Sequence, residues 1–214
     1  MTKVFVLISL FLGICLGSQY TPIPKIPDGL IIGDNPNLVI EAYYDIFCPG
    51  SRESYNIFKT VIESLEKDSF TFIIHQFPLP YHKNAFSASA GYKYIWKTIS
   101  SEAAYKFEGL MLNNLEQFTD LATLNLKQSE VYQKIIDLVK TQLPQYQINY
   151  DELLNSMKPG TPENIETRYS WKYGTSRSVS GTPTIFVNGV LFDKGEELSA
   201  QQWIQYIQNR KQQN

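Results

Sequence analysis

The chain has 214 residues, of which 43 % are hydrophobic and 14 % aromatic, and its formal net charge is −2. This composition supplies a packed core and excludes a wholly disordered chain. The small net charge and the lack of a basic cluster argue against a nucleic-acid partner. The length suits one large domain or one domain that carries an insertion.

The first residues are typical of a secretory signal peptide. Lys3 is followed by a short apolar run, Val4–Leu16, and then by small residues. We expect cleavage after Gly17, so that residues 1–17 are removed. The alternative is a membrane anchor, but the run is shorter than the roughly 20 apolar residues of a spanning helix. The sequence therefore predicts a protein of the secretory pathway, extracellular or in the lumen of the endoplasmic reticulum or a vacuole, with no membrane span after cleavage.

The next segments predict a strand, a helix and a second strand. Residues 19–36 contain four prolines and predict an extended lead-in. The apolar run Leu38–Tyr44 predicts a central strand, and hydrophobic residues at helical spacing follow over residues 51–65. Phe70–Phe77 predicts the second strand. Strands joined by a helix in this way are expected to pair in parallel.

The middle of the chain predicts helices. Three apolar stripes with helical spacing lie within residues 85–99, 107–115 and 131–143. Thr161 followed by Pro162 predicts the N-cap and first turn of a further helix.

The last segments predict a β-hairpin and a final helix. Thr184–Val187 and Val190–Phe192 flank Asn188-Gly189, the preferred pair for a tight hairpin turn. Ser199 and Gln202 form a capping box before the final helix. The predicted order is βαβ, a helical block, and ββα, which is a small α/β sheet with an all-helical insertion.

Four sequence blocks, together with this layout, resemble a known fold. The first block, residues 40–52, contains Cys-Pro at the first strand-to-helix junction, and the last block, residues 181–189, contains Gly-Thr-Pro before the hairpin. The other two blocks, residues 77–86 and 172–177, lie between them. The layout resembles a thioredoxin-like fold, and the helical insertion resembles its DsbA-like branch. More narrowly, the blocks are similar to a little-characterised group of secreted eukaryotic DsbA-like proteins.

The resemblance implies a division of the chain into parts. The signal peptide would be followed by the N-terminal part of the thioredoxin fold, the helical insertion and the C-terminal part of the thioredoxin fold. The expected ranges of these three parts are residues 18–80, 81–160 and 161–214.

The candidate nucleophile is Cys48 in the motif Cys48-Pro49-Gly50-Ser51. The other cysteine, Cys15, falls in the predicted signal peptide. At the start of a helix, unpaired N–H groups and the helix dipole favour a thiolate, so we expect an accessible thiol. Redox-active DsbA-like relatives have a second cysteine where this chain has Ser51. The Ser51 hydroxyl would either bond the thiolate or bond the backbone as an ordinary first-turn serine.

The resemblance also implies residues that bind substrate. A cis bond between Thr182 and Pro183 is expected beside the cysteine, where these two residues and Pro49 would receive an extended peptide as an added strand. Glu41 and Arg52 are candidates for tuning the ionisation of the thiol.

Two further side chains, Asp45 and His82, lie near the candidate site in the sequence. Asp45 is expected to be a solvated carboxylate at the rim of the site. His82 is expected to cap or pack rather than to act as a catalytic base. Two histidines and one mature cysteine are too few for the usual soft-ligand metal site, so no metal or cofactor is expected, and glutathione is a candidate co-substrate.

The sequence favours a secreted monothiol protein that carries out thiol–disulfide exchange. Isomerisation or glutathione-linked reduction suits a single thiol, and the expected partners are cysteine-containing or unfolded polypeptides. The alternative is a redox-inactive peptide-binding or chaperone-like module. A glutathione-conjugating enzyme is disfavoured, because relatives with that activity have a serine at the position of Cys48.

Overall fold

The computed structural model describes residues 23, 24 and 26–211, and the predicted signal peptide lies outside them. These residues contain a five-stranded sheet in the order β1-β3-β2-β4-β5. Strands β2 and β3 are parallel, as predicted, and the other neighbours are antiparallel. The strands are β1 (Leu30–Ile32), β2 (Val39–Tyr44), β3 (Thr71–Gln76), β4 (Thr184–Val187) and β5 (Val190–Leu191).

The two faces of the sheet differ because alternate strand residues point in opposite directions. Helices α2 (Pro49–Ser64) and α8 (Ala200–Lys211) cover one face, where Tyr44 and Phe72 pack with Phe58 and Trp203. Helix α7 (Pro162–Ser176) packs against β3 on the other face. That face carries several polar side chains, which matter for the site described below.

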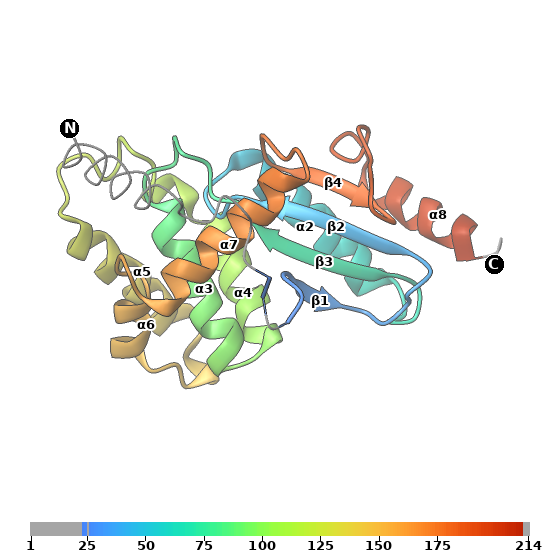
Figure 1. Ribbon diagram of the computed structural model, residues 1–214. Helices are drawn as coiled ribbons and strands as arrows, with labels where there is room; N and C mark the ends of the chain where they lie inside the picture. Colours follow the sequence, from blue (N-terminus) through green and yellow to red (C-terminus); the bar gives the residue numbers. More distant parts are fainter. Residues whose placement is uncertain (1–22, 25, 212–214) are drawn as a thin grey trace, which may run out of the picture.

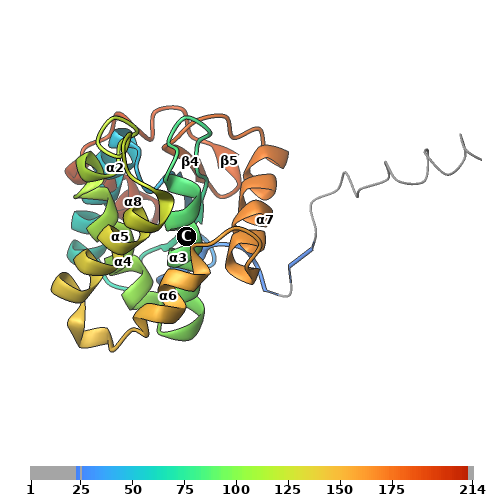
Figure 2. The same ribbon diagram turned by 90° about the vertical axis from the view of Figure 1, so that its left-hand side faces the viewer.

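The remaining helices form a block beside the sheet, between β3 and α7 in the chain (Figure 1). Figure 2 views the molecule from this side and shows these helices grouped together, with α7 running past them. Their shared core contains Tyr92, Phe107 and Ile135. The block comprises α3 (Ala85–Thr98), α4 (Ser101–Leu112), α5 (Gln128–Gln142), α6 (Tyr150–Ser156) and the short 3₁₀ helices η1 (Leu115–Gln117) and η2 (Pro144–Tyr146).

The predicted end signals of the helices and hairpin match the structure. The Thr161 hydroxyl accepts a hydrogen bond from the Asn164 N–H, and Ser199 and Gln202 bond reciprocally. Asn188 and Gly189 both have positive φ, as a type I′ turn requires. The boundaries of the insertion at residues 81 and 160 stay a prediction.

Four short elements were not predicted, namely β1, α6 and the 3₁₀ helices η1 and η2. Strand β1 lies in the proline-rich lead-in, between Gly29 and Gly33, which both have positive φ. Its three residues are too few to show a strand period. Helix α6 has only seven residues, so its apolar stripe is equally short.

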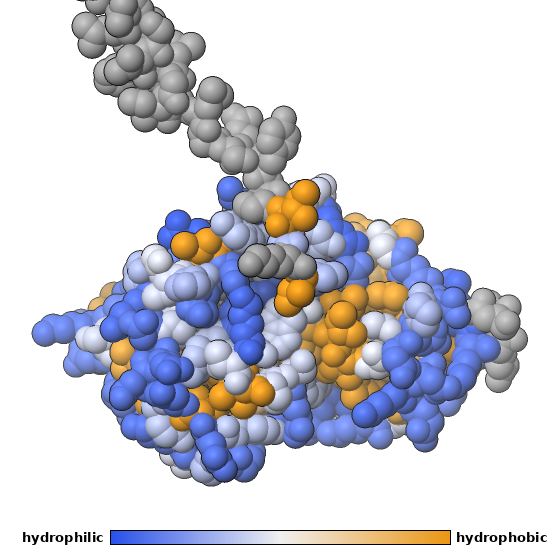
Figure 3. Space-filling model, turned by 60° about the horizontal axis from the view of Figure 1, so that its bottom comes forward, coloured by the Kyte–Doolittle hydropathy of each residue, from blue (hydrophilic) through white to orange (hydrophobic). Residues whose placement is uncertain are grey.

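The surface is mainly hydrophilic on the face drawn in Figure 3, with hydrophobic residues in a few separate patches. Among the described residues, no helix is both long enough and apolar enough to cross a membrane.

Candidate active site

Cys48 lies where β2 gives way to α2. It is the N-cap residue of α2, and its carbonyl accepts a hydrogen bond from the Arg52 N–H at 3.0 Å. The sulfur is therefore near the positive end of the helix. Only 8 % of Cys48 is exposed, which is less than the sequence predicted, because the loop that carries Thr182 packs against it.

The Thr182–Pro183 peptide bond is cis and lies next to Cys48. The Cys48 thiol donates a hydrogen bond to the Thr182 carbonyl oxygen at 3.2 Å. Gly50 allows this approach, since a Cβ at Gly50 would lie 2.9 Å from Pro183 Cδ. Thr182 Oγ1 is buried and has no hydrogen-bond partner among the described residues. The first turn of α2 and the Thr182-Pro183 loop thus meet around the sulfur.

Ser51 and Arg52 bond to groups other than the Cys48 sulfur. Ser51 is fully buried, and its hydroxyl oxygen accepts a hydrogen bond from the Asp45 N–H at 3.2 Å. This contact corresponds to the second of the two predicted alternatives, a serine that bonds the backbone. The Arg52 guanidinium points to the helical block and forms an ion pair with Glu116 of η1.

The prediction that Asp45 is a solvated rim carboxylate is wrong, because Asp45 is fully buried. Its carboxylate accepts hydrogen bonds from the Phe47 N–H at 2.7 Å and the Leu79 N–H at 2.6 Å. Its backbone carbonyl accepts one from the Cys48 N–H at 3.0 Å. Asp45 therefore binds the segment before Cys48 to the segment that follows β3.

His82 lies against the same carboxylate. Its Nδ1 is 3.0 Å from Asp45 Oδ2, although the two groups are not well aligned for a hydrogen bond. The contact with Asp45 outweighs the effect of burial and raises the pKa of His82 above its usual 6.5. Because Nδ1 faces Asp45, Nε2 is the ring nitrogen left open, and 23 % of the side chain is exposed.

Two surface cavities meet at His82. One, of about 320 Å³, is lined by Phe47 and Pro49, which flank Cys48, by Tyr81 and His82, and by residues of the segment 115–121. The other, of about 300 Å³, lies between the segment 78–86 and Trp171. His82 is thus positioned at the edge of a cavity that borders the Cys48 motif.

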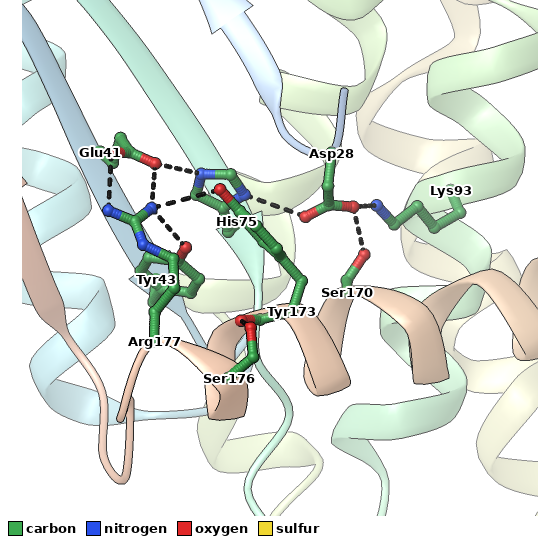
Figure 4. Close-up of polar contacts among 9 residues, drawn as sticks. All are labelled: Asp28, Glu41, Tyr43, His75, Lys93, Ser170, Tyr173, Ser176 and Arg177. Atoms are coloured by element: carbon green, nitrogen blue, oxygen red, sulfur yellow. Dashed lines mark hydrogen bonds and ion pairs between the residues drawn. The ribbon is translucent and has the colours of Figure 1, made fainter. Parts of the chain in front are cut away.

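Glu41 belongs to a buried chain of alternating charges on the face of the sheet that α7 covers (Figure 4). Arg177 donates to both Glu41 oxygens, and His75 Nε2 lies 3.1 Å from Glu41 Oε2. His75 Nδ1 lies 2.9 Å from Asp28 Oδ2, and Lys93 donates to Asp28 Oδ1 at 2.9 Å. The order of the chain is Lys93, Asp28, His75, Glu41 and Arg177.

The two carboxyl groups in this chain of charges are kept ionised by their neighbours. Burial alone would raise both carboxyl pKa values, but Lys93 and His75 hold the pKa of Asp28 well below its usual range. Hydrogen bonds from His75 and Arg177 likewise outweigh burial and lower the pKa of Glu41 to about 2. Each ring nitrogen of His75 thus faces a carboxylate oxygen, so the imidazole is held between Asp28 and Glu41. Both Glu41 oxygens are already bound, so any influence of Glu41 on the thiol would act through the electric field alone.

Arg177 also fixes the start of the loop that leads to Pro183. Its guanidinium donates to the Tyr43 hydroxyl at 2.9 Å and lies over the Phe186 ring, 4.1 Å from the centroid. The end of α7 is therefore bound to β2 and β4.

Three features of the site were missed by the sequence analysis. They are the Asp45–His82 pair, the close approach of Gly50 to Pro183, and the Arg177–Glu41 pair. For Gly50, a glycine inside the first helical turn was a usable indication of close backbone packing. The other two join residues far apart in the chain and leave no local pattern.

A metal centre finds no support in the described part of the chain. Within residues 23–211, residue 25 aside, no group of three or more His, Cys, Asp or Glu side chains is arranged to hold an ion.

Comparisons with known proteins agree with this fold. No curated protein matches the sequence. Among solved structures, Chlamydia trachomatis DsbA is 16 % identical with a TM-score of 0.69, covering 92 % of this chain and 97 % of its own. A putative protein-disulfide isomerase from Pseudomonas syringae is 16 % identical with a TM-score of 0.66, covering 84 % and 98 %. Oxidised BdbD from Bacillus subtilis is 16 % identical with a TM-score of 0.62, covering 90 % and 97 %.

A family model described as thioredoxin (Thioredoxin_4) matches residues 25–209, nearly all of the described chain. The chain therefore belongs to the thioredoxin family, and its fold is the DsbA-like form with an inserted helical block.

Proposed function

We propose that the protein is a secreted monothiol that exchanges disulfides with polypeptide substrates through Cys48. The observation that carries this proposal is the position of the sulfur, at the start of α2 and 3.2 Å from the Thr182 carbonyl. Reactive cysteines of other proteins are often found at the N-terminal end of a helix. Membership in a DsbA-like family of thiol–disulfide oxidoreductases supports the same chemistry.

The single thiol limits the reaction. Cys48 would attack a substrate disulfide and form a mixed disulfide, which Ser51 has no sulfur to resolve. A second thiol, from glutathione or from the substrate, must then release the enzyme. Isomerisation or glutathione-linked reduction therefore fits better than net oxidation.

The surroundings of Cys48 support a polypeptide substrate. An extended peptide could pair with the backbone at Thr182 and Pro183, next to the sulfur. The cavity lined by Pro49 and Tyr81 would take an apolar side chain of the peptide. Cysteine-containing or unfolded polypeptides are the proposed partners.

We also propose that residues 1–17 direct the chain into the secretory pathway, extracellularly or to an endoplasmic reticulum or vacuolar lumen. Expression in a eukaryotic host followed by N-terminal sequencing tests this. The mature protein should begin at Ser18, and an intact N-terminus would contradict the proposal.

Incubation with glutathione disulfide tests the reaction. Mature protein should gain one glutathione, mapped to Cys48 by peptide mass, and excess reduced glutathione should remove it. Cys48→Ser is the control and should remain unmodified. Folded wild-type protein that forms no adduct would overturn the proposal.

A redox-inactive peptide-binding module is the second candidate. It is favoured by the low exposure of Cys48, at 8 %. In this case an unfolded, cysteine-free client should bind wild-type protein and Cys48→Ala equally well. Tyr81→Ala, which truncates an exposed side chain at the cavity, should weaken that binding. Loss of client binding in Cys48→Ala would contradict a thiol-independent role.

A further inference from the structure

The Asp45 carboxylate and the His82 imidazole lie in contact beside the Cys48 motif. The buried carboxylate of Asp45 is held by two backbone N–H groups, so its position is fixed. It faces Nδ1 of His82, which leaves Nε2 as the nitrogen that can meet another molecule. A carboxylate in contact with one ring nitrogen favours the protonated imidazole, and the other ring nitrogen is then the one that can give a proton to a substrate.

The position of His82 brings this group to the Cys48 motif. His82 borders the cavity of about 320 Å³ whose other walls include Phe47 and Pro49, the neighbours of Cys48. The departing half of a substrate disulfide attacked by Cys48 could extend past Phe47 and Pro49 into this cavity and meet the imidazole there.

We propose that His82 is a catalytic acid in the disulfide exchange, with Asp45 as its positioning residue. This inference rests on the proposed function, since it assigns a role within that reaction. The substrate class is a disulfide whose departing sulfur is a basic alkyl thiolate, as in a cystine-containing polypeptide or glutathione disulfide.

The chemistry balances without a cofactor. The Cys48 thiolate attacks one sulfur of the substrate, a new S–S bond forms, and the old S–S bond breaks with its electron pair on the departing sulfur. His82 Nε2–H gives its proton to that sulfur, which leaves as a thiol. Cys48 is thereby oxidised to a mixed disulfide, and one half of the substrate disulfide is reduced and released as a thiol. A small external thiol then reduces the mixed disulfide, and its proton returns to Nε2 of His82.

The charges around His82 favour its protonated form. Asp45 is its nearest anion, Asp120 lines the same cavity, and both raise the pKa of His82. Lys83, which lines the other cavity, is the neighbouring cation, and the Tyr81 ring meets the imidazole edge to face at 5.0 Å. His82 should therefore carry the proton that it donates at pH values below its raised pKa, and it should lose this proton as the pH rises through that pKa.

Two disulfides with different leaving groups test this role. Glutathione disulfide releases a basic thiolate that benefits from a proton, whereas dithiobis-nitrobenzoate releases a stable aromatic thiolate that needs none. In His82→Gln, the reaction of Cys48 with glutathione disulfide should slow by roughly tenfold or more, and that with dithiobis-nitrobenzoate should stay within about twofold. The effect is smaller than that of most catalytic acids because alkyl thiolates already leave fairly well.

Lys83→Gln is the matched control. It removes one positive charge from the same loop, so it reports any effect of charge on the anionic glutathione disulfide, and it leaves the imidazole in place. Its ratio of the two rates should be that of the wild type. Asp45→Asn should shift the loss of the glutathione disulfide reaction to lower pH.

The outcomes separate this role from the proposed function. Equal slowing of both reactions, or slowing of neither, in His82→Gln would overturn the role of His82 while leaving Cys48 reactive. No reaction of wild-type protein with either disulfide would overturn both proposals. If His82→Gln does not fold, the wild-type protein tests the role of His82 by itself. The measured quantity is the rate with glutathione disulfide divided by the rate with dithiobis-nitrobenzoate. This ratio must fall as the pH rises through the pKa of His82. A constant ratio would contradict the proposal.

Discussion

The two histidines of the chain lie beside carboxylates in opposite settings. His75 is 2 % exposed, and each of its ring nitrogens faces an anion. The His82 side chain is 23 % exposed, and only Nδ1 faces an anion. An imidazole whose nitrogens are both occupied cannot pass a proton to a substrate without breaking an ion pair. His75 is therefore placed to stabilise the fold, whereas His82 keeps one ring nitrogen available for chemistry.

This contrast predicts that substitutions around the two histidines should differ in their effects on stability and on the disulfide rates. Changes in the chain of charges around His75 should lower stability and leave the ratio of the two disulfide rates unchanged. Changes at His82 should alter that ratio with little loss of stability.

Arg177→Met should have the largest effect on stability. It leaves the buried Glu41 carboxylate without its strongest partner, and breaking a buried pair costs roughly 3–5 kcal/mol. We expect the lower end of that range, about 3 kcal/mol, because the Arg177 side chain is 19 % exposed. Urea unfolding measures the loss.

Lys97→Met is the matched control, since it removes a more exposed ion pair that joins α3 to α7. It should cost only about 0–1 kcal/mol. Equal losses in the two variants would show that the buried chain of charges does not stabilise the protein more than a surface pair does.

Gly50→Ala should disturb the close contact between the first turn of α2 and the Thr182-Pro183 loop. The added Cβ would lie 2.9 Å from Pro183 Cδ, so the loop must move, at a cost of about 1–3 kcal/mol. Gly181→Ala is the control in the same loop, because a Cβ there meets nothing within 4 Å. The measurements are urea unfolding and the rate of Cys48 alkylation. Identical alkylation rates in the two variants would contradict a close contact around the sulfur.

His82 should titrate above its usual value of 6.5, and this is a smaller effect than the two above. The raised pKa means that the ion pair with Asp45 stabilises the fold fully below about pH 6.5 and loses its contribution as the pH rises through the raised value. Proton NMR of the His82 ring gives the midpoint. In Asp45→Asn the midpoint should fall, and an unchanged midpoint would show that Asp45 does not control this imidazole.

Arg52→Gln should have the smallest effect. The ion pair between Arg52 and Glu116 lies on the surface, with side-chain exposures of 33 % and 62 %. We therefore expect no measurable change in the urea midpoint and little change in the reaction of Cys48 with dithiobis-nitrobenzoate. A marked fall in that rate would instead support the predicted role of Arg52 in tuning the thiol.

The local features of the fold could be read from the sequence. The apolar run of β2, the helical stripes and the Thr161 and Ser199 caps each depend on residues within a few positions of one another. Strand β1 was missed because its pairing with β3, rather than its own three residues, defines it.

The site was only partly predictable for the same reason. Cys48, Pro49 and Pro183 could be identified from short motifs, and the structure brings them together. The burial of Asp45 could not, since it depends on Leu79 from the segment after β3. Nor could the contact of Glu41 with Arg177, which are 136 residues apart and meet only once the sheet and α7 have packed.

Asp28 is the N-terminal residue whose contacts join α3, β3 and α7. It binds Lys93 of α3, His75 of β3 and Ser170 of α7, although it precedes the first strand. A truncation that stops short of Asp28 leaves this junction whole. One that removes it would leave the buried Lys93 ammonium group without its anion and His75 without one of its two carboxylate partners, so an electrostatic contact limits how far the N-terminus can be shortened without loss of stability.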